Sequence, residues 1–168
     1  MRKLQNPWLN LPEYKCFGCS PNNLAGVHMT FYEDGDEIVT VWKPESQFQG
    51  WHNTLHGGIQ TLLMDEIAAW TVARKLQTTG VTSKLEVRFK KALYTTDKYM
   101  IVRASISEIK RNIVTIKTAI YNQLDEICAE AACTYFTFTK EKAQEMKFSG
   151  CGVESNETTL ERLLAEFH

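Results

Sequence analysis

The stretch LHGGIQTLLMDEIAAWTVARKL, residues 55–76, decides the architecture of this protein. It contains no glycine or proline after Gly58, and its length predicts one long helix from about Gly57 to Leu76. The polar side of this helix is thin and consists essentially of Gln60, Thr71, Arg74 and Lys75. Because so narrow a polar face cannot cover a helix lying on a surface, we expect other structure to surround it.

Two β-prone runs precede this helix and four follow it. VHMTFYE and EIVTVWK flank the turn residues 34–36, which predicts a hairpin. Apolar and polar residues alternate in KLEVRFKK, YMIVRASISEI, NIVTIKTAIYN and EICAEAACTYFTF, as in strands with one buried face. The short links predict an antiparallel meander. The order of elements predicts an α+β fold, in which a curved antiparallel sheet wraps around one long central helix.

The chain divides into three segments by composition. Residues 1–27 are rich in proline, asparagine and glycine and predict an irregular N-terminal arm. Residues 28–140 hold the helix and the β-prone runs. Residues 141–168 form a charged tail, in which TTLERLLAEF predicts a short C-terminal helix.

Charge and hydropathy exclude several classes of function. Lys plus Arg number 19 and Asp plus Glu number 20, so no overall field favours nucleic acid or an anionic membrane. No apolar run reaches the roughly 18 residues of a membrane span, and MRKLQNPW lacks the apolar core of a secretory signal. We therefore expect a cytoplasmic protein without nucleic-acid or membrane partners.

Five cysteines at irregular spacing do not predict a disulfide framework in a chain of this length. Cys16 and Cys19 form one CxxC, which is half of a zinc site or a redox pair. Because no second pair of ligands follows at a suitable distance, we expect two reduced thiols and no metal.

Adjacent acids, Asp65 and Glu66, stand in the middle of the predicted helix. Seven residues separate Gly58 from Asp65, so two turns bring this acid beneath the glycine, while Glu66 is rotated toward Trp70. Apolar neighbours deprive such a carboxylate of hydration, which can raise its pKa toward a range useful for a base. At the helix N-terminus, the amides of His56-Gly57-Gly58 can donate to an oxygen that develops negative charge.

The separation between these groups predicts a dimer. Two helical turns place Gly58 and Asp65 about 10 Å apart, whereas a reacting carbonyl should lie about 3 Å from both its donor and its attacking group. A symmetric dimer, with amides from one copy and the acid from the other, would close this gap. The alternative is that the glycines only cap a turn and Asp65 forms a hydrogen bond at a dimer seam.

His56-Gly57-Gly58 followed after six residues by Asp65 resembles the HGGxxxxxxD motif of the hotdog-fold acyl-CoA thioesterases, PaaI-like branch. FQGWHNTLHGG resembles the QGxxGxxHGG of that branch, with Asn53 where a glycine is usual; asparagine tolerates left-handed backbone. KCFGCSPNNLAGVHMTF resembles a C-x-x-C-G-x-x-N-x-x-G-L segment found in one subset. TSKLEVRFKKAL resembles the strand after the helix, so the resemblance runs from about Cys16 to Phe138.

The resemblance implies hydrolysis of an acyl-CoA to a carboxylic acid and free coenzyme A. It implies Asp65 as general base or nucleophile, with Gly57 and Gly58 polarising the carbonyl and His56 orienting the turn. Gln49 and Thr82 would be secondary, Thr82 lying near the attacking water.

The same resemblance implies a homodimer, or a tetramer built from dimers. It requires no cofactor beyond the coenzyme A of the substrate. The phosphates of that group need cations, and the local candidates are Lys90, Lys91, Lys110 and Arg111.

Two other functions fit the same resemblance. The first is a non-catalytic module that binds acyl-CoA or a fatty acid in the same groove. The second is a hotdog dehydratase, which uses a histidine and an acid from partner chains; His52 and His56 are the candidates. The acyl chain preference stays open at this level.

Overall fold

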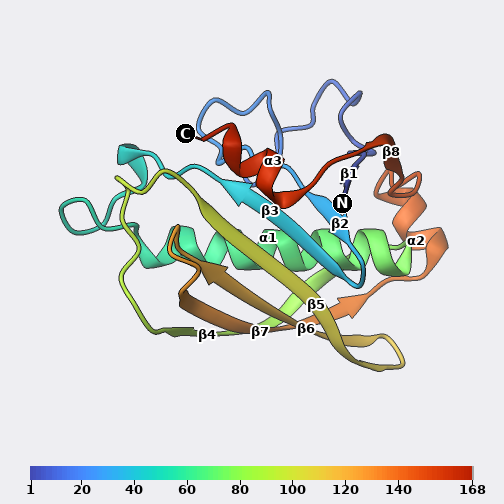
Figure 1. Cartoon of the computed structure of the whole chain (residues 1–168). Coiled ribbons are helices and arrows are strands. Elements are labelled where there is room, and N and C mark those ends of the chain that lie inside the picture. The colour runs from blue at the N-terminus through green and yellow to red at the C-terminus, as the bar shows by residue number, and fades with distance from the viewer. Residues whose placement is uncertain (168) are drawn as a thin grey trace.

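The computed structural model describes residues 1–167 and consists of one antiparallel sheet packed along a single long helix (Figure 1). The long helix is α1 (Gly57–Leu76). The strands are β1 (Arg2–Leu4), β2 (Tyr32–Asp34), β3 (Glu37–Trp42), β4 (Gly80–Phe89), β5 (Met100–Lys110), β6 (Ile113–Tyr121), β7 (Ile127–Thr137) and β8 (Val153–Glu157). The short helices are η1 (Ser46–Phe48), α2 (Lys140–Glu145) and α3 (Leu160–Ala165). None of the helices in this part of the chain has the length and apolarity needed to cross a bilayer.

Helix α1 confirms the predicted central helix and its boundaries. It is surrounded, as expected, because β3 to β7 all contact it. Two residues assigned to its polar face are buried instead. The Gln60 amide donates to the Leu55 carbonyl (3.0 Å), and the Thr71 hydroxyl donates to the Ile67 carbonyl (2.8 Å). These local bonds satisfy polar atoms that water would otherwise hydrate.

The strand order is β4-β7-β6-β5-β3-β2-β1-β8. Strands β5, β6 and β7 form the predicted meander, but β4 pairs with β7 rather than with β5. The connection between β4 and β5, residues 90–99, is longer than a hairpin turn and crosses to the other side of the meander. Strand β4 therefore lies at one end of the sheet with an unpaired edge.

The N-terminal arm and the C-terminal tail both contribute to the sheet, contrary to the irregular arm that we expected. Strand β1 pairs with β2 on one side and with β8 on the other, so the blue and red segments of Figure 1 lie side by side. The predicted β2–β3 hairpin is present, with Gly35 in left-handed backbone (φ 59°). Residues 27–31, which belong to the first predicted β-prone run, lie outside β2. The amides of Val27 and Met29 donate instead to the carbonyls of Phe17 and Gly18, respectively. The short C-terminal helix is α3, capped by Thr159.

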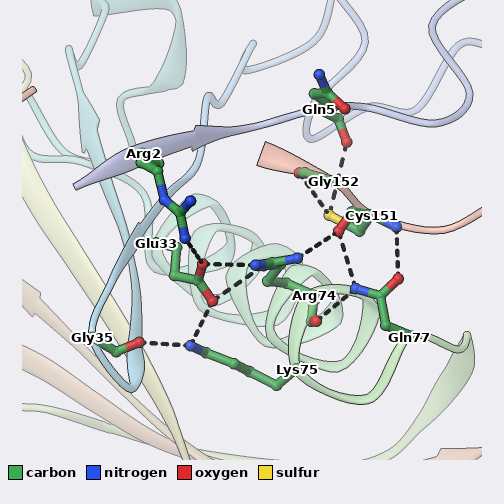
Figure 2. A network of polar contacts seen from close by, with 9 residues as sticks. All are labelled: Arg2, Gln5, Glu33, Gly35, Arg74, Lys75, Gln77, Cys151 and Gly152. Atoms are coloured by element: carbon green, nitrogen blue, oxygen red, sulfur yellow. Dashed lines mark hydrogen bonds and ion pairs between the residues drawn. The ribbon is translucent and has the colours of Figure 1, made fainter. Parts of the chain in front are cut away.

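A charged network fixes the C-terminal end of α1 (Figure 2). Glu33 of β2 accepts hydrogen bonds from Arg74 (2.9 and 3.1 Å) and Lys75 (2.8 Å). Arg74 also donates to the Cys151 carbonyl (3.0 Å), which joins this end of the helix to the segment before β8. Burial raises the pKa of Glu33, but the bonds and charges of Arg74 and Lys75 outweigh it and lower this pKa to about 2.

Candidate active site

The N-terminus of α1 presents one free backbone donor. Nδ1 of His56, the residue that caps the helix, accepts a hydrogen bond from the Gly58 amide (2.9 Å). The expected donation by Gly58 to a substrate is therefore not available in this arrangement. Within residues 1–167 no hydrogen bond occupies the Gly57 amide, which also lacks an intrahelical acceptor. Gly57 is left as the donor of this turn.

Two glycines make room for the imidazole ring of His56. A Cβ atom at Gly58 would lie 3.0 Å from Nδ1, and one at Gly50 would lie 3.2 Å from Cδ2. Because Nδ1 accepts a hydrogen bond, the neutral ring carries its hydrogen on Nε2. His56 thus caps the first turn of α1 through Nδ1.

A cleft of about 860 Å³ opens at this end of α1. It brings together five of the predicted residues: Gln49, His56, Gly57, Lys90 and Lys91. Its other lining residues are Gly50, Trp51, Thr54, Leu55, Gln60, Phe89 and Ala92.

Two of these other lining residues, Gln60 and Phe89, lie close to Gly57. The Oε1 atom of Gln60 is buried and has no hydrogen-bond partner in the described chain. Its spacing of three residues from Gly57 was a usable signal, because it places both on one helix face. Phe89 at the end of β4 packs against Gly57. His52, the candidate of the dehydratase hypothesis, is exposed and is not among the lining residues.

The loop before α1 is held by its own polar groups. The Gln49 side-chain carbonyl accepts from the Asn53 amide (3.1 Å), and Asn53 adopts left-handed backbone (φ 56°), as its residue type allows. The His56 amide donates to the Phe48 carbonyl (3.0 Å). Gln49 therefore shapes the loop that carries His56.

Asp65 and Thr82 form a second group, away from the cleft. The Thr82 hydroxyl donates to Asp65 Oδ1 at 2.6 Å, beside a bulge in β4 between Thr82 and Lys84. Neither side chain is among the residues that line the cleft. Within one chain, the Gly57 cleft and the Asp65–Thr82 pair are therefore two separate groups.

Glu66 is rotated away from Asp65, as helical geometry predicted. Its Oε1 accepts from Trp70 Nε1 (3.1 Å) and lies 3.3 Å from Cys16 Sγ. Burial, reinforced by Cys16, raises the pKa of Glu66 to about 7. The sequence predicted that apolar neighbours raise the pKa of a carboxyl group in this helix. The structure shows this effect at Glu66.

The remaining predicted cations lie outside the cleft: Lys110 is the last residue of β5, and Arg111 is in the turn between β5 and β6. The next residue, Asn112, accepts a hydrogen bond from the Thr137 amide, and Thr137 pairs with Gly80 at the start of β4. The cleft lies at the other end of β4, which is about 30 Å away for a strand of this length. One chain does not bring the two pairs of cations together.

Comparison with known families identifies the fold and the family. Residues 52–136, half of the chain, match the thioesterase superfamily. The chain belongs to the thioesterase superfamily. The match includes α1 and β4 to β6 entirely and nearly all of β7, so it covers His56, Gly57, Asp65 and Thr82 but not Gln49. No curated protein matches the chain.

Solved structures of the superfamily share this hotdog fold at low identity. One thioesterase superfamily protein is 15% identical with a TM-score of 0.66; the match covers 72% of this chain and 62% of that one, so the chain spans less than two thirds of its length. A hypothetical thioesterase protein from Streptococcus pneumoniae TIGR4, solved with coenzyme A, is 22% identical (66% and 85% covered, TM-score 0.61). The E. coli PaaI protein from the phenylacetic acid degradation operon is 17% identical (67% and 81% covered, TM-score 0.62).

Proposed function

We propose that this superfamily member hydrolyses an acyl-CoA thioester to a carboxylic acid and free coenzyme A. The observation that carries the proposal is the free amide of Gly57 in a cleft beside His56, together with an aspartate held by a threonine hydroxyl. One group supplies a donor for the carbonyl oxygen and the other supplies a base. Coenzyme A bound to the S. pneumoniae protein supports the choice of thioester.

The Gly57 amide would stabilise the oxyanion. It donates to the carbonyl oxygen of the thioester as that oxygen gains negative charge, aided by the positive end of α1. A donor of this kind accelerates acyl transfer by about 10²- to 10³-fold. His56 keeps the amide aimed into the cleft by holding Gly58 through Nδ1.

Asp65 would supply the base. It removes a proton from water, the resulting hydroxide attacks the carbonyl carbon, and the tetrahedral intermediate collapses with breakage of the carbon–sulfur bond. The coenzyme A thiolate then takes up a proton. Thr82, whose hydroxyl bonds to Oδ1, orients the carboxylate toward this water. Direct attack by Asp65, through an anhydride that water then hydrolyses, is the alternative route for the same residue.

The free edge of β4 supports a site shared between two copies. This strand has ten residues, and no strand of the described chain covers its outer edge. Val81 (49%) and Phe89 (53%) are strongly exposed there. Long, exposed apolar edges are templates for pairing with another strand.

A two-fold axis near the middle of β4 would join the two groups of residues. Antiparallel pairing of two β4 strands places Thr82 and Asp65 of one copy beside Gly57 at the partner's cleft. The same symmetry brings Lys110 and Arg111 to the partner's Lys90–Lys91 segment. One dimer would thus contain two complete sites, each with a cationic rim for coenzyme A phosphates.

Thiol release from a panel of acyl-CoA esters tests this function. The wild type should release free thiol from at least one ester, and Asp65→Ala should lower kcat/KM by at least about 100-fold. Asp36→Asn, which removes one carboxylate from the exposed β2–β3 turn, is the matched control and should keep full turnover.

Two outcomes contradict the proposal. One is a folded Asp65→Ala variant with wild-type turnover. The other is calorimetric binding of acyl-CoA by the wild type without thiol release from any ester, which would favour the binding module.

A further inference from the structure

A second cluster of reactive side chains lies between the N-terminal loop and α1, outside the groups assigned to hydrolysis. Cys16 Sγ lies 3.1 Å from Cys19 Sγ and 3.3 Å from Oε1 of Glu66. One ligand atom from each of the three residues lies within 4.8 Å of the other two. The CxxC comes from the loop, and the carboxylate comes from a helix residue 50 positions along the chain.

The separations in this cluster are close to those of a metal site. Tetrahedral zinc with Zn–S bonds of about 2.3 Å holds two thiolate sulfurs about 3.8 Å apart, and a sulfur and a carboxylate oxygen about 3.5 Å apart. The observed 3.3 Å approaches the second value, and the observed 3.1 Å falls about 0.7 Å short of the first. A disulfide would need the sulfurs about 1 Å closer than they are, at 2.05 Å. The cluster is therefore nearer to a metal site than to a disulfide.

Neighbouring residues hold the carboxylate against the loop. Trp70 Nε1 donates to Oε1 of Glu66, which fixes the carboxylate as outer partners fix metal ligands. A methyl group at Gly18, inside the CxxC, would overlap the Glu66 carboxyl group. The loop thus approaches α1 as closely as a residue without a side chain permits.

The polar groups of this cluster are acidic groups or neutral hydrogen-bond donors. The polar groups that meet there are the thiols of Cys16 and Cys19, the Glu66 carboxyl, the Tyr14 hydroxyl (2.7 Å from Cys19 Sγ) and the indole N–H of Trp70. Within residues 1–167 no lysine, arginine or histidine forms an ion pair with Glu66. Two thiolates and a carboxylate would bring three negative charges together, which a divalent cation compensates.

We propose that Cys16, Cys19 and Glu66 bind one zinc ion, which clamps the N-terminal loop to α1. Thiolate sulfur selects zinc over the hard cations magnesium and calcium. The three residues also line a cavity of about 340 Å³, where a water molecule would complete the tetrahedron. The carbonyls of Phe17 and Gly18, within the CxxC, accept from Val27 and Met29, so the ion would also stabilise the segment that leads into β2.

Titration with Co²⁺ and Zn²⁺ tests the site without use of the thioesterase reaction. Reduced full-length protein, freed of metal by a chelator, should bind one Co²⁺ per chain, with thiolate-to-cobalt absorption in the near ultraviolet and intense visible bands of tetrahedral cobalt. An equimolar amount of Zn²⁺ should remove these bands and raise the melting temperature. Cys16→Ser should weaken Co²⁺ binding by at least about 100-fold, and Glu66→Gln by at least about tenfold.

Cys128→Ser is the matched control, because Cys128 is buried elsewhere and its thiol donates to the Glu126 carbonyl, a bond that serine can keep. This variant should bind Co²⁺ like the wild type. If Cys16→Ser does not fold, Co²⁺ binding by Glu66→Gln tests the site instead, because this variant keeps both thiols. Three results would overturn the zinc site: no cobalt bands at equimolar metal in the reduced protein, equal binding by the wild type and Glu66→Gln, or equal loss of binding in Cys128→Ser. A mass loss of about 2 Da in the Cys16–Cys19 peptide, without metal binding, would instead identify a dithiol–disulfide pair.

Discussion

Replacement of Glu33 by glutamine tests the network that fixes the end of α1 (Figure 2). The Glu33 side chain is 14% exposed and contacts Arg74 and Lys75 at 2.8–2.9 Å, with Arg2 at 3.8 Å. Its pKa falls from 4.5 to about 2 in the folded protein, through those cations and against the effect of burial. At about 1.4 kcal/mol per pKa unit, the ionised group contributes roughly 3 kcal/mol to the free energy of unfolding.

The sign of the pH dependence follows from the lowered pKa. The contribution of Glu33 is fully present above the unfolded-state pKa of 4.5 and is lost as pH falls toward 2. We expect Glu33→Gln to lower the free energy of unfolding by roughly 3 kcal/mol at neutral pH, or the melting temperature by about 6–12 °C for a chain of this length. The difference from wild type should shrink at about pH 3.

Urea denaturation followed by circular dichroism at neutral and acidic pH measures this difference. Glu145→Gln is the control, because Glu145 also pairs with a lysine (2.5 Å) but is 66% exposed in α2, so its loss should leave the midpoint unchanged. A Glu33→Gln variant as stable as the wild type at neutral pH, or a loss of stability that is the same at both pH values, would refute the reasoning.

Three further substitutions address the proposed site. Gly58→Ala should keep the fold by circular dichroism but lower kcat/KM about tenfold, because its Cβ would press on His56 Nδ1 (3.0 Å) and turn the free amide away. Thr82→Val, which removes the bond to Asp65 at nearly constant volume, should lower kcat about tenfold with little change in KM; a change in KM alone would exclude a positioning role. Val81→Lys, on the open edge of β4, should produce monomers in sedimentation and lose thiol release; an active monomer would contradict the shared site.

Several elements were predictable because their signals are local. The span of α1 follows from uninterrupted helical sequence, and the left-handed Asn53 follows from its residue type. Alternating side chains marked β4 to β7, since each strand has one face toward the core. The spacing from Gly58 to Asp65 also separated the two acids, because helical rotation depends only on residue number.

Other features depend on contacts between distant segments. Periodicity identifies a strand but not its neighbours, so the place of β4 at the sheet edge required the complete pairing. The hydrogen bond from the Gly58 amide to His56 depends on the rotamer of the His56 side chain. Packing against Gly50 sets that rotamer. Likewise the sequence offered one CxxC without further ligands, and only folding brought Glu66 to it.

The sequence by itself determined the central helix, the strands, and the residue types from which a thioesterase site could be built, because helix and strand periods are properties of neighbouring residues. Only the tertiary structure decided how those residues are grouped: the Gly57 amide with the cleft, Asp65 with Thr82, and Glu66 with the cysteines. The physical reason is that hydrogen bonds and burial act through space, between groups whose separation along the chain does not fix their distance.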